Sequence, residues 1–318
     1  MAAITVVMST WSHRKDQVEQ LRRKFSQIEF VVPSNDAEYA AVMPRAHVVV
    51  GRLPQDLLPQ ARNLRWVQNQ GAGVDRLLTP EIIASDVIVT NAQSLHATQI
   101  SEHVLTMMLA FARGFLQILQ AQRDHVWRPP DFHPFCLEGQ TLGVVGAGGI
   151  GGALAEKAHH LGMHVIGLRR HPKERPAYLA ELVGPEGLHD LLRRSDHVAV
   201  CCPLTEETRG LVGETELRLM KQTAYIYNIG RGKIIQAEPL LQALKEGWIA
   251  GAGLDVTDPE PLPPDSELWD MPNVIVTQHT SGTAPHNDDR FYDLLEQNLQ
   301  RFLDGEQLLH VVDKEAGY

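Results

Sequence analysis

Short runs of β-branched and apolar residues alternate with helix-like stretches along almost the whole chain. In the N-terminal third the runs are ITVVM, FVV, HVVVG, RWVQNQ and VIVTNA, and stretches such as KDQVEQLRRKF and PEIIASD separate them. Near-continuous apolar strands that alternate with helices are typical of a parallel sheet covered by helices on both faces. The pattern therefore predicts an α/β fold.

A second series of the same kind follows a proline-rich loop, RDHVWRPPDFHPFCLEGQ. Its strand-like runs are TLGVVG, MHVIGL, HVAVCC, AYIYNIG, AGAGLDV and NVIVTQH. A chain of 318 residues is too long for one compact core, so the two series predict two domains. The tail DDRFYDLLEQNLQRFLDG predicts one more helix with a single apolar face.

Composition limits the partners and the compartment. The formal net charge of −10 argues against general affinity for nucleic acid or for an anionic membrane. The apolar segment VLTMMLAFARGFLQILQA at 104–121 carries Arg113 near its middle, which would cost about 3 kcal/mol in a bilayer, so it predicts one buried helix between domains. Three cysteines, two of them adjacent, indicate core thiols rather than a disulfide framework. We expect a cytoplasmic protein.

A glycine-rich turn follows the first strand of the second series. Gly146, Gly148 and Gly151 form the pattern G-x-G-x-x-G between an apolar run and a helix-like stretch. The first glycine permits a tight turn, the second lets a pyrophosphate approach the backbone, and the third lets helix and strand pack closely. The positive end of the helix then faces the phosphates. The motif predicts a dinucleotide site.

The next strand, MHVIGL, ends in two arginines where such sites usually carry an acidic residue. A carboxylate there would bind the free ribose 2′-hydroxyl, whereas Arg169 and Arg170 suit a 2′-phosphate, which guanidinium groups bind bidentately. The alternative is an ordinary basic surface turn. We therefore expect a site that prefers NADPH and still admits NADH.

Three later segments place groups suited to the reduction of a 2-oxo acid just after strand-like runs. Arg231 lies in YNIGRGKII, Glu260 in GLDVTDPEPLP and His279 in NVIVTQHTSG. A planar guanidinium can hold the substrate carboxylate, and a histidine can protonate the oxygen that receives charge when hydride is added. A carboxylate beside that imidazole would fix its tautomer. In open parallel sheets, ligands bind at the carboxyl ends of the strands, where all three residues lie.

These segments carry a family resemblance. The chain resembles the D-isomer-specific 2-hydroxyacid dehydrogenases in four segments: VVGAGGIGG, NIGRGKII, GLDVTDPEPLP and VIVTQHTSG. The basic residue Arg169 in place of the usual acidic one is similar to the NADPH-dependent glyoxylate/hydroxypyruvate reductases of that family. The resemblance implies two doubly wound domains with an interdomain cleft: a flavodoxin-like substrate domain (1–98 plus 284–318) and a Rossmann cofactor domain (99–283). It also implies a homodimer formed through the cofactor domain, and NAD(P)H-dependent reduction of a small 2-oxo acid to a D-2-hydroxy acid. One departure is Gln278, where many members have proline before the histidine.

The resemblance also implies roles for individual residues. The catalytic arginine, glutamate and histidine of the family fall on Arg231, Glu260 and His279. Its substrate-carboxylate loop falls on Gly71, Ala72 and Gly73 in NQGAGVD, which would share the carboxylate with the arginine. Its cofactor contacts fall on Gly148, Gly149, Ile150, Pro203, Thr208, Ile229 and Asp255, in addition to Gly146, Gly151 and the two arginines.

Other functions remain open at this point. One is a nicotinamide-responsive binding protein, resembling the corepressor branch of the same family, which also retains the Arg–Glu–His set. Another is a phosphite or formate oxidiser on the same scaffold. The loop residues His125, Asp131, His133 and Cys136 raise the question of a metal site, but a closed zinc site shows a more complete ligand set, so we expect no metal. His103, at the start of the long apolar segment, is assigned no catalytic part.

Overall fold

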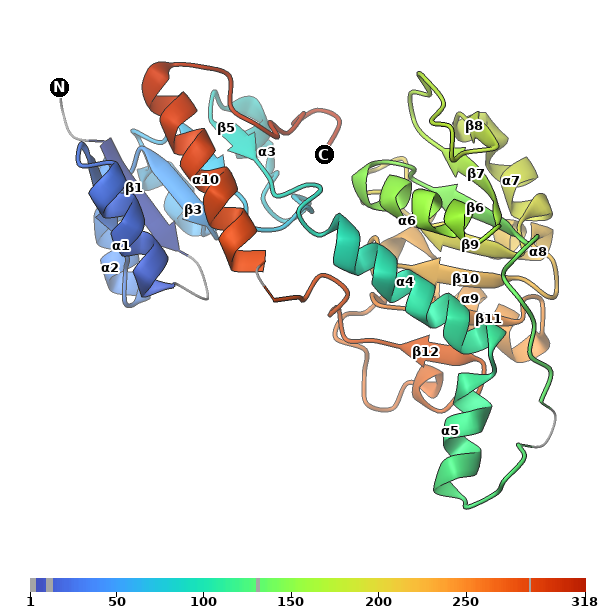
Figure 1. The fold of residues 1–318 in the computed structure, drawn as a ribbon. Coiled ribbons are helices and arrows are strands. Elements are labelled where there is room, and N and C mark those ends of the chain that lie inside the picture. The colour runs from blue at the N-terminus through green and yellow to red at the C-terminus, as the bar shows by residue number, and fades with distance from the viewer. Residues whose placement is uncertain (1–3, 10–13, 130–131, 286) are drawn as a thin grey trace. The chain divides into compact units, whose positions relative to one another are not determined.

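The computed structural model describes residues 4–9, 14–129, 132–285 and 287–318. The chain divides into two compact units: unit 1 comprises Met1–His96 and Ala284–Tyr318, and unit 2 comprises Ala97–Thr283. Each unit contains a parallel sheet with helices, which confirms the α/β prediction (Figure 1).

Unit 1 has a sheet of five strands within its described residues, in the order β2-β1-β3-β4-β5. This is the flavodoxin-like order. The strands are β1 (Ile4–Ser9), β2 (Ile28–Val31), β3 (Val48–Gly51), β4 (Trp66–Gln68) and β5 (Ile88–Thr90). The helices are α1 (Lys15–Lys24), α2 (Asp36–Val42), α3 (Pro80–Ala84) and α10 (Asn287–Asp304), with short 3₁₀ turns η1 (Met43–Arg45) and η2 (Gln55–Gln60).

Helices cover both faces of this sheet. α1 and α10 come from opposite ends of the chain, and both pack on the face that carries Trp66 (Figure 1). α2 and α3 pack on the other face. Val6 and Val7 are adjacent in β1 and belong to opposite clusters, as the two-residue period of a strand requires. The apolar face predicted for the C-terminal helix is therefore buried in the core of unit 1.

Unit 2 has a sheet of seven strands within its described residues, in the order β12-β11-β10-β9-β6-β7-β8. Counted along the chain, this is the Rossmann order with one strand added at the β12 edge. The strands are β6 (Thr141–Val145), β7 (His164–Leu168), β8 (Glu181–Val183), β9 (His197–Val200), β10 (Tyr225–Asn228), β11 (Gly251–Leu254) and β12 (Val274–Val276). The helices are α4 (Ala97–Ala112), α5 (Phe115–Arg123), α6 (Gly149–His160), α7 (Leu188–Arg194), α8 (Glu214–Leu219) and α9 (Ala237–Glu246), with 3₁₀ turns η3 (Pro185–Gly187), η4 (Gly232–Ile234) and η5 (Glu267–Trp269).

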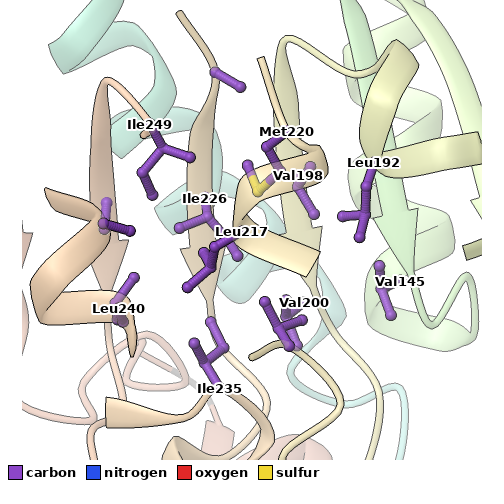
Figure 2. Packing of buried hydrophobic residues seen from close by; sticks show 14 of the residues in the cluster. Val145, Leu192, Val198, Val200, Leu217, Met220, Ile226, Ile235, Leu240 and Ile249 are labelled. Atoms are coloured by element: carbon purple, nitrogen blue, oxygen red, sulfur yellow. The ribbon is translucent and has the colours of Figure 1, made fainter. Parts of the chain in front are cut away.

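The unit 2 sheet is also covered on both faces. Side chains of α7, α8 and α9 pack with Val198, Val200 and Ile226 in the cluster that Figure 2 shows. α4 and α6 pack on the opposite face, where they meet Tyr227. Because every central strand is enclosed in this way, polar groups are displaced to the strand ends, where the candidate site lies.

The apolar segment at 104–121 forms two helices, so the prediction of a single buried helix is wrong. Gly114 has a φ of 62°, a left-handed conformation that glycine adopts at little cost, and α5 leaves α4 at an angle of 68°. α4 packs in the core of unit 2, whereas Phe115 and Leu119 of α5 are 50% and 44% exposed. Among the described residues, no single helix is both long enough and apolar enough to cross a membrane.

Candidate active site

Three residues singled out in the sequence follow neighbouring strands of unit 2. Arg231 follows β10, Glu260 follows β11 and His279 follows β12, and these three strands are adjacent and parallel. Because the carboxyl ends of parallel strands meet at one edge of a sheet, the three segments emerge at the same edge.

The imidazole of His279 is hydrogen-bonded to the carboxylate of Glu260. The distance from Nδ1 to Oε1 is 2.9 Å, and the side chains are 48% and 31% exposed. An ionised carboxylate only accepts hydrogen bonds, so Nδ1 carries the proton of this contact and Nε2 is the nitrogen left for a reacting group. An accessible imidazole that a carboxylate orients in this way is suited to proton donation.

The turn that carries Arg231 lies against the segment that follows β11. A Cβ at Gly232 would lie 1.9 Å from the carbonyl oxygen of Thr257, so glycine is required for this approach. The Asn228 side chain donates to the carbonyl oxygen of Arg231 at 3.0 Å, and Nη1 of the arginine donates to the carbonyl oxygen of Gly230 at 2.9 Å. These contacts orient a half-buried guanidinium, whose planar fork suits a carboxylate.

Asp255 organises the segment that carries His279. Its carboxylate, in a residue only 2% exposed, accepts hydrogen bonds from Thr277 Oγ1 at 2.6 Å, from Thr280 N at 2.9 Å and from Ser281 N at 3.2 Å. Burial opposes ionisation of this carboxyl, but the hydrogen bonds outweigh burial and hold the pKa of Asp255 below its ordinary value. His279 has a φ of 54°, which residues other than glycine rarely adopt, and its N–H donates to the carbonyl oxygen of Asp255 at 2.8 Å.

The glycine-rich turn joins β6 to α6, and each glycine meets a different environment. Gly146 has a φ of 100°, and a Cβ there would lie 2.5 Å from the backbone nitrogen of Cys202. A Cβ at Gly151 would lie 2.2 Å from the carbonyl oxygen of Gly146. A Cβ at Gly148 would meet nothing within 4 Å, and this exposed glycine is the N-cap of α6. Open space in front of unpaired helix N–H groups suits a pyrophosphate.

The two arginines after β7 lie beside this turn and beside the loop that follows β9. Nε of Arg169 donates to the carbonyl oxygen of Ala147, within the glycine turn. Nη2 of Arg170 lies 2.6 Å from Oε1 of Glu207, and the two side chains are 37% and 62% exposed. A phosphate bound by Arg170 would therefore compete with a carboxylate already in place.

Other expected cofactor contacts lie near the same strand ends. Thr208 Oγ1 donates to the carbonyl oxygen of Pro203 at 2.6 Å, which closes the loop after β9. Ile229 is buried, and its N–H donates to the carbonyl oxygen of Val200 at 3.2 Å. Ile150 lies in the first turn of α6, immediately after Gly149. All of these groups belong to unit 2.

The loop Gly71–Ala72–Gly73 lies in unit 1, after β4. Nδ2 of Asn69 donates to the carbonyl oxygens of Gly71 and Gly73 at 2.9 Å, and Nδ2 of Asn91 donates to that of Ala72 at 2.8 Å. In the described part of the chain, the N–H groups of these three loop residues donate to no protein acceptor. A loop whose carbonyls are bound inward while its N–H groups remain available can accept an anion.

The loop 125–136 supplies no metal-ligand cluster within the described residues, where no three His, Cys, Asp or Glu side chains are grouped to hold a metal ion. Asp131, one of the four residues considered in the sequence, lies outside the described residues. Cys136 is a free thiol, as are the other two cysteines.

Two contacts at this edge of unit 2 do not follow from the sequence. Glu207, which pairs with Arg170, is an exposed acidic residue in a loop and matches no motif. His103, assigned no part in the sequence analysis, lies with Nε2 2.9 Å from Thr277 Oγ1. It lies near the middle of α4, and the sequence gave no signal for this contact, because the partner is 174 residues away.

Comparison with known proteins adds to this geometry. Residues 105–281 match the model of a family described as D-isomer specific 2-hydroxyacid dehydrogenase, NAD binding domain. A glyoxylate reductase from Thermococcus kodakarensis is 36% identical over 274 residues, which cover 83% of this chain and 81% of the relative.

Two solved structures superpose with TM-scores of 0.87 at 30% identity. One is a D-isomer specific 2-hydroxyacid dehydrogenase from Xanthobacter autotrophicus in complex with NADPH and MES, with 100% of each chain covered. The other is an NADPH-dependent glyoxylate/hydroxypyruvate reductase from Sinorhizobium meliloti in complex with NADP and sulfate, covering 99% of this chain and 100% of that chain.

Proposed function

The chain belongs to the D-isomer specific 2-hydroxyacid dehydrogenase family, and we propose that it reduces a small 2-oxo acid of the glyoxylate or hydroxypyruvate type to a D-2-hydroxy acid, with NADPH preferred to NADH. The observation that carries this proposal is the 2.9 Å contact between His279 Nδ1 and Glu260 Oε1, at the sheet edge that also bears Arg231. The names of the similar proteins support the substrate class and the cofactor.

In the proposed reaction, Arg231 binds the substrate carboxylate. In unit 1, the backbone N–H groups of Gly71, Ala72 and Gly73 are donors that suit a carboxylate. The nicotinamide supplies a hydride to the carbonyl carbon when the cofactor is bound. His279 gives the proton on Nε2 to the carbonyl oxygen, which becomes the hydroxyl of the product, and the neutral imidazole regains a proton from solvent. Glu260 holds Nδ1 throughout, so that Nε2 stays directed to the substrate. Unit 1 acts as the substrate domain and unit 2 as the cofactor domain.

Different residues of unit 2 would hold the different parts of the dinucleotide. Gly148, which faces open space, and Gly149 and Ile150 in the first turn of α6 would hold the pyrophosphate. Arg169 and Arg170 would hold the 2′-phosphate, for which Arg170 would exchange its ion pair with Glu207. Pro203, Thr208 and Ile229 would line the same site, and Asp255 is the residue that we propose near the nicotinamide carboxamide. NADH lacks the phosphate that the arginines bind, so it is accepted more weakly.

The oligomeric state is proposed from an exposed apolar surface on unit 2. Phe115 and Leu119 of α5 are 50% and 44% exposed, and in the segment after it Val126 and Trp127 are 47% and 95% exposed. Large apolar side chains that are exposed along one short stretch of chain favour association with another chain. We assign this surface to a homodimer formed through the cofactor domain. The three free thiols accord with a cytoplasmic location.

The test is a substrate panel with the purified protein. Loss of NADPH absorbance is followed with glyoxylate, hydroxypyruvate and phenylpyruvate, and each assay is repeated with NADH. The product of hydroxypyruvate is separated on a chiral column and is expected to be D-glycerate. His279→Ala is the control variant: its turnover should collapse, whereas NADPH binding, measured by fluorescence, should survive.

Each alternative has its own outcome. Absence of turnover with every acid, together with tight NADPH binding, would favour a cofactor-responsive binding protein. Reduction of NADP⁺ by phosphite or formate would favour the oxidiser. Wild-type turnover in His279→Ala would place the proton donor elsewhere and overturn the proposed mechanism.

A further inference from the structure

His103 joins the catalytic edge of unit 2 from a different element. It lies on α4, is 23% exposed, and its Nε2 is 2.9 Å from Oγ1 of Thr277, just after β12. The direction of this hydrogen bond follows from the hydrogen bond between Thr277 and Asp255. Thr277 Oγ1 donates its single proton to Asp255 Oδ1 at 2.6 Å, so the hydroxyl can only accept from His103. The imidazole therefore carries a proton on Nε2.

The carboxylate that ends this chain of hydrogen bonds also holds the backbone next to His279. Asp255 accepts from Thr280 N at 2.9 Å and from Ser281 N at 3.2 Å. Its own carbonyl oxygen accepts from His279 N at 2.8 Å. Residues on both sides of the left-handed His279 are thus bound to one buried aspartate. A strained backbone conformation persists only where its surroundings fix it in this way.

A second residue of α4 holds the far end of the same segment. Gln99 Nε2 donates to the carbonyl oxygen of Gly282 at 3.3 Å. Gln99 and His103 are four residues apart, so they lie on one face of the helix. α4 therefore contacts the segment 277–282 at both ends, with His279 between the two contacts.

We propose that His103 is a positioning residue for His279: through Thr277 and Asp255 it fixes the segment that aims the imidazole. This inference rests on the proposed function, in which His279 is the proton donor. His103 touches no reacting atom, so its removal changes the placement of the donor and not the chemistry. A misplacement of about 1 Å at a reacting group can cost roughly 100-fold in rate.

The test compares His103→Leu with His103→Gln, whose amide nitrogen reaches about as far as Nε2 and keeps a donor for Thr277. In His103→Leu we expect kcat to fall by about 10-fold or more, with KM for the 2-oxo acid and the NADPH dissociation constant each within about threefold of wild type. His103→Gln should recover most of kcat. Thr277→Val should lower kcat as His103→Leu does, whereas Thr277→Ser should not. The double variant His103→Leu with Thr277→Val should lower kcat no further than either single variant. Thr106→Ala, an exposed change on the same helix, is the matched control.

A second readout does not depend on turnover. The imidazole ¹H–¹⁵N signals of His279, assigned with the His279→Ala variant, should shift or broaden in His103→Leu and return in His103→Gln. If wild type reduces no 2-oxo acid, the proposed function fails and these signals alone decide whether His103 positions His279. A kcat of His103→Leu within twofold of wild type, or unchanged His279 signals, would overturn the inference. Equal losses of kcat and of thermal stability in the Leu and Gln variants would also overturn it, because packing alone would then explain the effect.

Discussion

In the glycine-rich turn, two single Gly→Ala substitutions should affect different properties, one cofactor binding and the other stability. Gly148→Ala places a Cβ in open space, since nothing lies within 4 Å of it and its φ is −84°. Gly151→Ala places a Cβ 2.2 Å from the carbonyl oxygen of Gly146, which is backbone and cannot rotate away. The two variants therefore differ in what the added methyl meets, although they are three residues apart in one turn.

The magnitudes follow from those contacts. Overpacking a rigid site costs roughly 1–3 kcal/mol, so Gly151→Ala should lose about that much stability. For a domain of this size each kcal/mol lowers Tm by about 2–4 °C, which gives a loss of several degrees. Gly148→Ala should leave Tm unchanged. Its methyl instead occupies the space proposed for the pyrophosphate, and the loss of one hydrogen bond to a charged group, about 1.5–3 kcal/mol, corresponds to roughly 10- to 100-fold weaker NADPH binding.

Thermal unfolding without cofactor and NADPH fluorescence titration measure the two effects separately. A Tm of Gly148→Ala as low as that of Gly151→Ala would show that the turn is packed more tightly than its geometry indicates. An NADPH dissociation constant of Gly148→Ala within twofold of wild type would show that the phosphates do not lie over this glycine, and the assignment of the motif would fail.

Three further changes test other parts of the molecule. Arg169→Asp combined with Arg170→Ser should lower the ratio of kcat/KM for NADPH over that for NADH by about 100-fold or more, because two charge-assisted contacts to the 2′-phosphate are lost; a ratio within threefold of wild type would refute that assignment. Glu260→Gln should reduce kcat about 10- to 100-fold in steady-state assays while NADPH binding is retained, because the imidazole loses the carboxylate that orients it; unchanged kcat would remove this glutamate from the mechanism. Burial lowers the pKa of His197 to about 4 from 6.5, so below pH 6.5 the unfolded chain binds a proton that the native chain does not. As the pH is lowered from 6.5 to 4, the free energy of unfolding should therefore decrease by up to about 1.4 kcal/mol per pH unit more in wild type than in His197→Gln. Urea unfolding at several pH values measures this difference. Parallel pH profiles of the two proteins would contradict a neutral buried imidazole.

The parts of the fold that the sequence predicts well are those with long, regular patterns. Strands with near-continuous apolar runs became buried parallel strands, and the C-terminal helix buries the face that its periodicity predicts. The sequence did not predict β8, because Glu181–Val183 is a three-residue edge strand with intermediate exposure and no alternation. It also missed the break at Gly114, where one left-handed residue redirects a segment whose composition is mostly apolar on both sides of the break. Both failures concern features that a local hydrophobic pattern does not encode.

The same distinction between local patterns and long-range contacts applies to the candidate site. Arg231, Glu260 and His279 could be singled out because each stands in a recognisable segment just after a strand, and the adjacent strand ends bring the segments to one edge. Contacts between those segments and other elements could not be found. His103 reaches Thr277 across 174 residues, and only the packing of α4 on the sheet brings them together.

Strand register explains why three separate motifs emerge at one edge of the sheet. Asn228, Leu254 and Val276 are paired across the three strands, and Arg231 and His279 each come three residues after a paired position. β10 and β12 flank β11, so their backbones are separated by two strand spacings, roughly 10 Å. That backbone separation suits a carboxylate and an adjacent carbonyl, the groups that the proposed mechanism assigns to Arg231 and His279. A one-residue slip of β12 would turn its side chains to the opposite face and remove His279 from Glu260. The parallel pairing of β10, β11 and β12 therefore suits the two groups that every 2-oxo acid shares, and discrimination by the rest of the substrate must come from other residues.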